Sequence, residues 1–348
     1  MEATQVAPRP LLGRFRASRK RTFLRSAEPS DRSFHQTGHV SFRPDGRKRM
    51  FVLGMGFVGQ FFGQHLKNQG WEVSGTCTSE GKKKELQGRG LEAFLFDAYS
   101  PDLSILEMAK SYSHLLVSIP TLQGIGDPLL QHQNLLTSTL SGGNLEWLCY
   151  LSSTSVYGDS GGAWVDEDYP VNPTSEAAKS RIVAEEGWLS IGDFLGLSTQ
   201  VFRLGGIYGP GRSAVDTLIK KVPQSKGQTM RASKKYTSRV HVLDICQAIE
   251  ASISKPSSRR IYNVVDDDPA PREEVFAYAQ HLIDTKWPGL AKHVESPEIV
   301  RPRPEGIGSR GEKRVSNTRM KKELGVRLLY PSYKSGLVSI ANQLVNIG

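Results

Sequence analysis

The feature that most constrains the fold is a glycine-rich turn between a short apolar run and a stretch expected to be helical. Gly54, Gly56 and Gly59 form a GxGxxG pattern directly after Met50–Leu53. The first glycine permits a tight turn, the second lets the backbone approach a phosphate, and the third lets a helix pack closely on a strand. In this context the pattern predicts dinucleotide binding, against the alternative of a turn that binds nothing. The residues expected to line the pyrophosphate are Gly54, Gly56, Phe57, Val58 and Gly59.

Further apolar runs alternate with stretches expected to be helical. Such alternation implies a parallel sheet that is covered by helices on both faces. We therefore expect an α/β fold, with a Rossmann-type doubly wound parallel sheet and a smaller C-terminal α/β substrate lobe. The expected strands after the first are 71–77, 91–96, 114–119, 145–153, 198–204 and 260–265.

The chain is expected to divide into three parts. Residues 1–47 form a disordered transit peptide, 48–205 an NAD(P)-binding domain, and 206–348 mostly a substrate-binding lobe. Strands near 239–243 and 260–265 are expected to return to the sheet of the first domain.

The basic residues are concentrated at the N-terminus. Residues 1–49 hold 12 Lys and Arg against 4 Asp and Glu, which leaves 33 against 31 in the remainder. A segment that is rich in arginine, poor in acids and without an apolar core is typical of an organellar transit peptide. We expect import into the chloroplast, with the mitochondrion as the alternative; a basic tail that binds anionic surfaces is the other interpretation. The nearly neutral remainder argues against a nucleic-acid partner.

Cysteine spacing and hydropathy exclude other classes of protein. Cys77, Cys149 and Cys246 are odd in number and widely spaced, which excludes a disulfide framework and a Cys-pair zinc site. No stretch reaches the roughly 18–20 uninterrupted apolar residues that a membrane-spanning helix needs. We therefore expect neither a metal site nor a membrane partner.

The second expected strand ends without the acidic residue that usually binds the ribose of NAD. Cys77 occupies that place, and Glu80 could substitute for it. Lys82–Lys84 would suit a ribose phosphate, so we favour NADP over NAD; a solvated helix face is the alternative explanation for these lysines. The residues expected around the adenosine are Thr78, Ser79 and Asp97, the last with the alternative of a simple turn aspartate.

Five later segments carry motifs in a recognisable order, at 152–159, 203–212, 239–249, 262–267 and 313–325. They resemble the motifs of extended short-chain dehydrogenases/reductases, and most of all the atypical members that include the bacterial YeeZ-like proteins. With the basic leader, the resemblance suggests a plant organellar member. It implies an oxidoreductase or nucleotide-sugar epimerase/dehydratase-like enzyme that acts on a small molecule with a carbonyl or hydroxyl group. It also implies a homodimer through the helices that flank the sheet.

The resemblance exposes a departure at the catalytic pair of the family. Ala177 stands at the place of the tyrosine that moves the proton, and Arg181 at that of the lysine that holds the ribose. Arg181 could still bind a ribose hydroxyl, but its pKa is too high for proton transfer. Ser153 lies at the position of the family's serine, and Tyr157 is a nearby phenol that could take the proton role or pack under its loop. A catalytically silent NAD(P)-binding sensor or scaffold is therefore the alternative function.

Two arginines are candidates for substrate binding. Arg212 and Arg239 could each contact an anionic group of the substrate, with a structural ion pair as the alternative. His241 and Asp244 look like general acid/base partners, but we expect a buried packing residue and a helix N-cap. Asp266–Asp268 is expected to be the acidic entry of a helix rather than a metal site.

Overall fold

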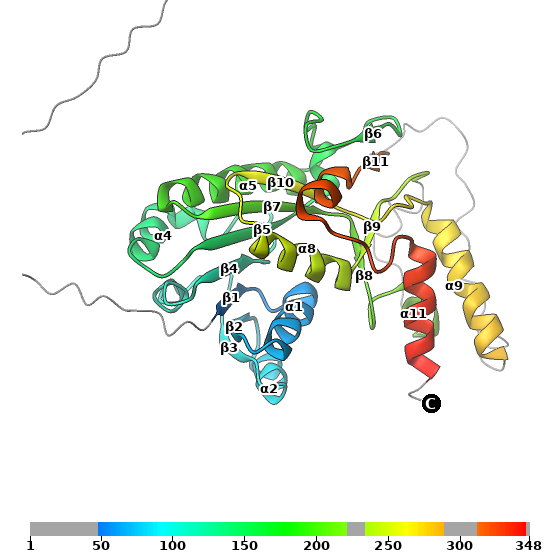
Figure 1. The fold of residues 1–348 in the computed structure, drawn as a ribbon, viewed down its shortest axis with the longest axis horizontal. Coiled ribbons are helices and arrows are strands. Elements are labelled where there is room, and N and C mark those ends of the chain that lie inside the picture. Colours follow the sequence, from blue (N-terminus) through cyan, green and yellow to red (C-terminus); the bar gives the residue numbers. More distant parts are fainter. Residues whose placement is uncertain (1–47, 221–233, 289–311, 346–348) are drawn as a thin grey trace, which may run out of the picture. The chain divides into compact units, whose positions relative to one another are not determined.

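The computed structural model describes residues 48–220, 234–288 and 312–345 (Figure 1). The expected transit peptide, residues 1–47, lies outside the described residues, so that prediction stays open. Within the described ranges, no helix is both long enough and apolar enough to cross a bilayer. In the same ranges, no group of three or more His, Cys, Asp or Glu side chains could hold a metal ion.

A seven-stranded, entirely parallel sheet forms the centre of the fold and confirms the expected Rossmann-type architecture. The strand order reverses between β1 and β4, which opens a crevice at the carboxyl ends of these two strands. In spatial order the strands are β10 (Arg260–Val264), β7 (Ser198–Leu204), β5 (Trp147–Ser153), β4 (His114–Val117), β1 (Arg49–Leu53), β2 (Glu72–Cys77) and β3 (Glu92–Leu95).

Both faces of the sheet are covered, and the central strand β1 is apolar on both sides. In β1, Met50 and Val52 pack on one face, and Phe51 and Leu53 pack on the other. The first face is covered by α1 (Phe57–Asn68), α2 (Glu80–Gly88), α8 (Val242–Ser254) and the π-helical turn η3 (Met320–Leu324). The second is covered by α3 (Ile105–Ala109), η1 (Leu130–His132), α4 (Gln133–Leu140) and α5 (Glu176–Leu195).

A separate apolar cluster marks the smaller lobe beside the carboxyl ends of β7 and β10 (Figure 1). It joins three helices through residues such as Val215, Ala279 and Leu337. The helices are α6 (Ala214–Ile219), α9 (Arg272–Lys286) and α11 (Tyr333–Val345).

Only one of the two later segments rejoins the main sheet. Residues 260–264 form β10, whereas β9 (Arg239–His241) pairs with β8 (Gly206–Tyr208) in a sheet of their own. The expectation for 239–243 was wrong because β7 already has β5 and β10 on its two sides. The chain leaves the sheet after β7, where the Gly206 N–H donates to the carbonyl of Ser238 at 2.9 Å, and β9 pairs with that continuation.

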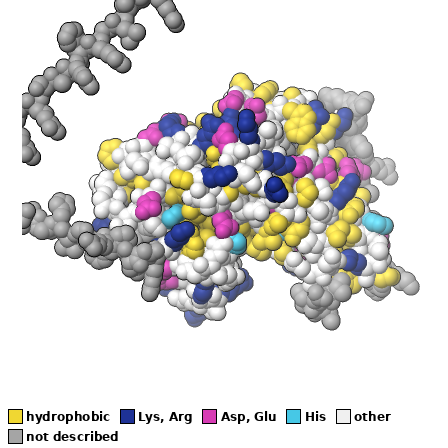
Figure 2. Space-filling view, viewed as in Figure 1, with side chains coloured by type: hydrophobic (Ala, Val, Ile, Leu, Met, Phe, Trp, Pro, Cys, Tyr) yellow, Lys and Arg dark blue, Asp and Glu magenta, His cyan; other side chains and the backbone are white. Residues whose placement is uncertain are grey.

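A second two-stranded pair joins β6 (Trp164–Val165) to β11 (Arg314–Val315), and the short helix η2 (Thr154–Tyr157) follows β5. Val156, Val165, Val265 and Val315 form a small apolar cluster that ties this pair to the end of β10. Figure 2 shows one face of the molecule, on which basic and acidic side chains are interspersed. That distribution agrees with the nearly neutral charge of the chain after residue 49.

Candidate functional site

The glycine turn connects β1 to α1 at the strand-order reversal. Gly54 has a φ of +101°, which side chains rarely permit, and a Cβ there would lie 3.1 Å from the backbone of Ser118 and Ile119. A Cβ on Gly59 would lie 2.5 Å from the carbonyl oxygen of Gly54, so this glycine is needed for close packing of helix and strand. At Gly56 a Cβ would meet nothing within 4 Å. The turn therefore leaves open space at the backbone that begins α1.

The start of α1 offers N–H groups and no competing acid. Gly56 is its N-cap and supplies no side-chain cap, and the first turn carries no acidic residue. Four orphan N–H groups and the positive end of the helix dipole together favour an anion. The space beside Gly56 and this donor set fit the pyrophosphate of a dinucleotide.

Arg212 lies next to this turn, although the sequence suggested a substrate contact. The loop after β8 packs on the start of α1, because a Cβ on Gly209 would lie 3.3 Å from Cζ of Phe57. The Arg212 guanidinium lies 5.3 Å from the centre of the Phe57 ring. Its positive charge is thereby placed beside the turn that fits a pyrophosphate.

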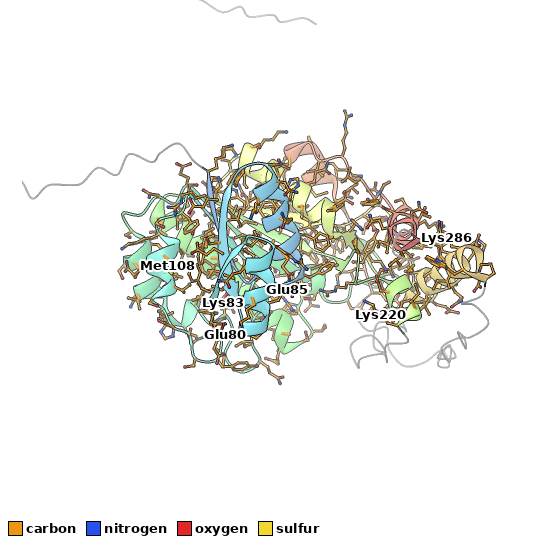
Figure 3. All side chains as sticks on the ribbon, turned by 90° about the horizontal axis from the view of Figure 1, so that it is seen from below. Glu80, Lys83, Glu85, Met108, Lys220 and Lys286 are labelled. Carbon is orange, nitrogen blue, oxygen red and sulfur yellow. The ribbon has the colours of Figure 1, made fainter. Side chains whose placement is uncertain are left out.

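The adenosine side of the crevice is formed by the end of β2 and the start of α2. Thr78 is exposed, and Ser79 caps α2 by accepting the N–H of Lys82 at 3.3 Å. The ammonium groups of Lys82 and Lys83 act to lower the pKa of the Cys77 thiol, although burial outweighs them and raises it. Both lysines therefore lie near the position of the missing carboxylate. Figure 3 shows Glu80, Lys83 and Glu85 together on α2.

Asp97 takes the role of a turn aspartate in this structure. It is exposed after β3, and its Oδ1 accepts the N–H of Tyr99 at 2.9 Å.

Ser153, Ser155 and Arg181 come together at the carboxyl end of β5. Ser153 Oγ accepts the N–H of Ser155 at 3.2 Å. Arg181 Nη1 lies 3.4 Å from Ser155 Oγ and donates to the carbonyl of Ala177 at 3.2 Å. Ala177 itself is exposed, and α5 presents only a methyl group there. The arrangement can bind and orient hydroxyl groups, but it offers no phenol for proton transfer.

Tyr157 is not available for the proton role that the sequence suggested. Its side chain is fully buried, and its hydroxyl donates to Asn263 Oδ1 at 2.8 Å and accepts from Arg203 Nη1 at 3.0 Å. Burial raises the pKa of the phenol, against the opposing effect of Arg203. The residue packs under its loop because both of its hydrogen-bonding positions are used by the protein.

The partner of Tyr157 belongs to a buried polar network that sequence analysis missed. Arg203 on β7 donates from Nη2 to Glu185 Oε2 at 2.7 Å and from Nε to both carboxylate oxygens at 3.2 Å. Ser152 Oγ donates to Glu185 Oε1 at 2.5 Å. The signal was the presence of Arg203 inside the apolar run 198–204, since a buried charge requires a partner. These hydrogen bonds hold α5 against β5 and β7, next to the Ser153 and Arg181 side chains of the candidate site.

Arg239 is buried on β9, next to helix α11 of the smaller lobe. It is 9% exposed, donates from Nη1 to the carbonyl of Thr237 at 2.8 Å, and lies 5.8 Å from the centre of the Tyr333 ring. Burial lowers the pKa of its guanidinium, while the charge of Asp266 acts to raise it.

His241 and Asp244 exchange the structural roles that the sequence suggested. His241 Nδ1, rather than Asp244, accepts an N–H at the start of α8, from Leu243 at 3.2 Å. Asp244 instead accepts the N–H groups of Leu329 and Tyr330 at 2.6 and 3.1 Å. Burial lowers the pKa of His241 to about 4 and raises that of Asp244 to about 6. Asp244 is not the cap because the loop before α11 supplies its two donors.

Comparisons with known proteins agree with this architecture. Residues 50–265 match the model of the NAD dependent epimerase/dehydratase family. The chain is 27% identical to Protein YeeZ of Escherichia coli K12 over 292 residues, which covers 82% of this chain and 97% of that protein.

Solved structures of similar proteins cover nearly the same part of the chain. A functionally unknown conserved protein from Silicibacter pomeroyi is 32% identical, with a TM-score of 0.66 over 85% of this chain and 99% of its own. UDP-glucuronic acid 4-epimerase from Bacillus cereus, solved with UDP-glucuronic acid and NAD, shares the fold at 16% identity and a TM-score of 0.62, covering 86% of this chain and 100% of its own. With the family model matching more than half of its residues, the chain belongs to the NAD dependent epimerase/dehydratase family.

Proposed function

We propose that this protein is a nicotinamide-dependent oxidoreductase or epimerase/dehydratase-like enzyme whose proton-transfer site departs from the family pattern. The observation that carries the proposal is the glycine turn, which has open space at Gly56 and an uncapped helix N-terminus beside it. A bound nicotinamide would supply hydride transfer to or from a carbonyl or hydroxyl carbon of the substrate.

The described residues divide the tasks of binding and orientation. The turn from Gly54 to Gly59 would hold the pyrophosphate, and Arg212 would add a cation beside it. Arg181 would bind a ribose hydroxyl, and Ser153 would donate a hydrogen bond that orients the reacting oxygen.

We infer a preference for NADP from the charges at the start of α2. Lys83 lies near Cys77, at the place where other members carry a ribose-binding acid, and is not among the lysines with an ion pair in the described residues. We expect Lys83→Glu to weaken NADPH binding at least tenfold and NADH binding less than twofold, as titrated by cofactor fluorescence. The matched control is Lys110→Ala, whose lysine follows α3 on another part of the surface. Equal losses for both cofactors would contradict the preference.

Ala177 offers no group for proton transfer, which supports the alternative of a silent NAD(P)-binding sensor or scaffold. The two functions are separated by Ala177→Tyr/Arg181→Lys, tested with NADPH and a panel of carbonyl substrates. An active natural protein that binds NADPH supports the enzyme. Activity that appears only in the double variant, typically 10²–10⁴-fold from one general acid/base, supports the silent protein. If the natural protein binds no nicotinamide nucleotide, both proposals fail.

The substrate and the assembly are proposals from the relatives and the surface. The Bacillus cereus structure contains a nucleotide sugar, which supports a small-molecule substrate of that kind for this chain. Val183 and Phe194, 71% and 70% exposed, lie three turns apart on α5, which supports a homodimer through this helix. The arginine-rich composition of residues 1–47 supports import into the chloroplast, with the mitochondrion as the alternative.

A further inference from the structure

A half-buried lysine without a carboxylate partner lies beside the short helix that follows β5. Lys313 directly precedes β11, and its Nζ donates to the carbonyl oxygen of Gly158 at 3.0 Å. In the part of the chain that the structure describes, this is the only hydrogen bond of the amine, and no Asp or Glu oxygen lies within ion-pair distance of it. No role described above uses this side chain.

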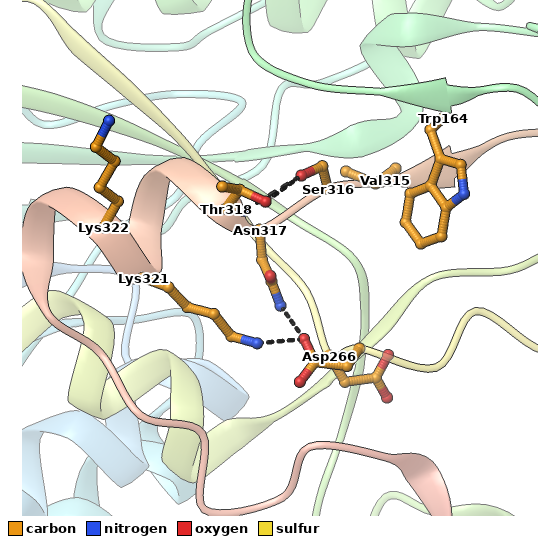
Figure 4. Close-up of a pocket in the computed structure, with 9 residues that line it drawn as sticks. Trp164, Asp266, Val315, Ser316, Asn317, Thr318, Lys321 and Lys322 are labelled. Atoms are coloured by element: carbon orange, nitrogen blue, oxygen red, sulfur yellow. Dashed lines mark hydrogen bonds and ion pairs between the residues drawn. The ribbon is translucent and has the colours of Figure 1, made fainter.

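The direction of the Lys313 side chain follows from the pairing of β11 with β6. Figure 4 shows Val315 and Trp164 on these two strands. Side chains alternate along an extended chain, so Lys313 leaves the backbone on the same side as Val315. Val315 packs with Val156 of η2 in the small apolar cluster, and Gly158 is the C-cap of the same helix. Lys313 is therefore directed inward, toward η2.

The backbone around Lys313 is held by hydrogen bonds to the loop after η2. The carbonyl oxygen of Glu312 accepts the N–H groups of Ser160 and Gly162 at 2.9 and 3.2 Å. In the opposite direction, the N–H of Glu312 donates to Asp159 Oδ1 at 3.1 Å. These contacts fix the point from which the lysine side chain starts.

The surroundings of Lys313 favour its neutral amine. Burial removes water from the ammonium group and the charge of Lys234 repels it, while the charge of Asp159 acts in the opposite direction. Together these effects lower the pKa of Lys313 to about 8. About half of such an amine is unprotonated at pH 8, against less than about 1% of an exposed lysine. A desolvated lysine beside a second cation is an activated nucleophile.

The same surroundings select a small electrophile whose product is an anion. A half-buried amine is reached more readily by a small linear molecule than by a bulky acyl donor. A carbamate formed on Lys313 would place a negative charge near Lys234, so that an attraction replaces the present repulsion. Its nitrogen would keep one hydrogen, which can still donate to the Gly158 carbonyl. Carbon dioxide meets these conditions.

We propose that Lys313 is a site of reversible carbamylation by carbon dioxide. The nitrogen lone pair attacks the carbon atom, an N–C bond forms, one C=O π pair moves to oxygen, and the amine releases one proton to water. No electron is transferred. The charge at the end of η2 changes from positive to negative, and Ser153 of the candidate site is the N-cap of this helix. An effect of the modification on catalysis rests on the proposed function, whereas the modification itself does not.

The test is chemical trapping on the full-length protein in ¹³C-labelled bicarbonate at pH 8. Triethyloxonium converts a carbamate to a stable ethyl ester, which peptide mass spectrometry locates. We expect at least tenfold more label on Lys313 than on the exposed Lys322, which is the internal control in the same sample. At a constant concentration of dissolved CO₂, labelling of Lys313 should rise through pH 8, and that of Lys322 only near pH 10.

Two variants separate a specific site from general reactivity. Lys313→Arg keeps a donor for Gly158 but offers no neutral amine, so it should lose the label while its circular dichroism is unchanged. Lys234→Ala removes the neighbouring cation, so it should reduce the label on Lys313 at least threefold at pH 8.

The outcomes that would overturn the proposal are separate from those that concern the proposed function. Equal labelling of Lys313 and Lys322 would show adventitious carbamylation only, and this comparison needs no variant. Absence of label on Lys313, or unchanged labelling in Lys234→Ala, would also refute the site. A protein that binds no NADPH but carries the label on Lys313 would refute the proposed function and leave the carbamylation site standing.

Discussion

Replacing Glu185 with alanine is expected to lower the free energy of unfolding by about 3–5 kcal/mol. The substitution removes the carboxylate that accepts from Arg203 and Ser152, and it leaves the guanidinium of Arg203 buried without its counter-charge. The side chains of both charged partners are only 5% exposed, so water cannot replace the lost contacts. Urea-induced unfolding followed by circular dichroism measures the change.

The matched control lies on the same helix. Glu176 forms an ion pair with Lys179 at 2.8 Å, but its side chain is 80% exposed. Glu176→Ala should therefore cost less than about 1 kcal/mol. If Glu185→Ala were no more destabilising than this control, the network would not hold α5 in place.

Replacing Gly56 with alanine is expected to weaken NADPH binding at least tenfold while the Tm stays within about 2 °C of the natural protein. The added methyl group meets no protein atom within 4 Å, so it occupies only the space where a pyrophosphate would lie. Fluorescence titration and thermal unfolding on the same preparation measure both quantities.

Gly59→Ala is the contrasting variant, because its added methyl group would meet the protein backbone rather than open space. Its methyl group would lie 2.5 Å from the Gly54 carbonyl oxygen, so we expect a loss of about 1–3 kcal/mol in stability along with weaker binding. Equal stability of the two variants, or full NADPH affinity in Gly56→Ala, would contradict the assignment of the turn.

The elements of the sheet could be predicted because their signals are local. The apolar runs 198–204 and 260–265 became β7 and β10, as expected from their alternation with helical stretches. The placement of β9 could not be predicted, because it depends on which strand edges remain free after the sheet has formed. The three residues of β9 do not indicate which strand edge will be free to pair with them.

Residues of the candidate site could be predicted where their role depends on local backbone geometry. They were harder to predict where the role depends on side chains from distant parts of the sequence. The glycine pattern located the turn, since each glycine is required by its own neighbourhood. Tyr157 was ambiguous because its partners, Arg203 and Asn263, come from strands 46 and 106 residues away. The burial of Asp266 gave no sequence signal, because an acidic run before a proline is equally typical of an exposed helix entry.

One side of helix α5 carries both the residue that attaches the helix to the sheet and the position of the family's catalytic tyrosine. Ala177, Arg181 and Glu185 follow each other at intervals of four residues, so they lie on one side of the helix. Glu185 is buried in the network, whereas Ala177 is exposed at the first turn. Evolution, or an engineer, can therefore exchange the residue at 177 without disturbing the attachment of the helix. Catalytic activity can thus be lost or gained at this position during evolution while the packing of α5 on the sheet is unchanged.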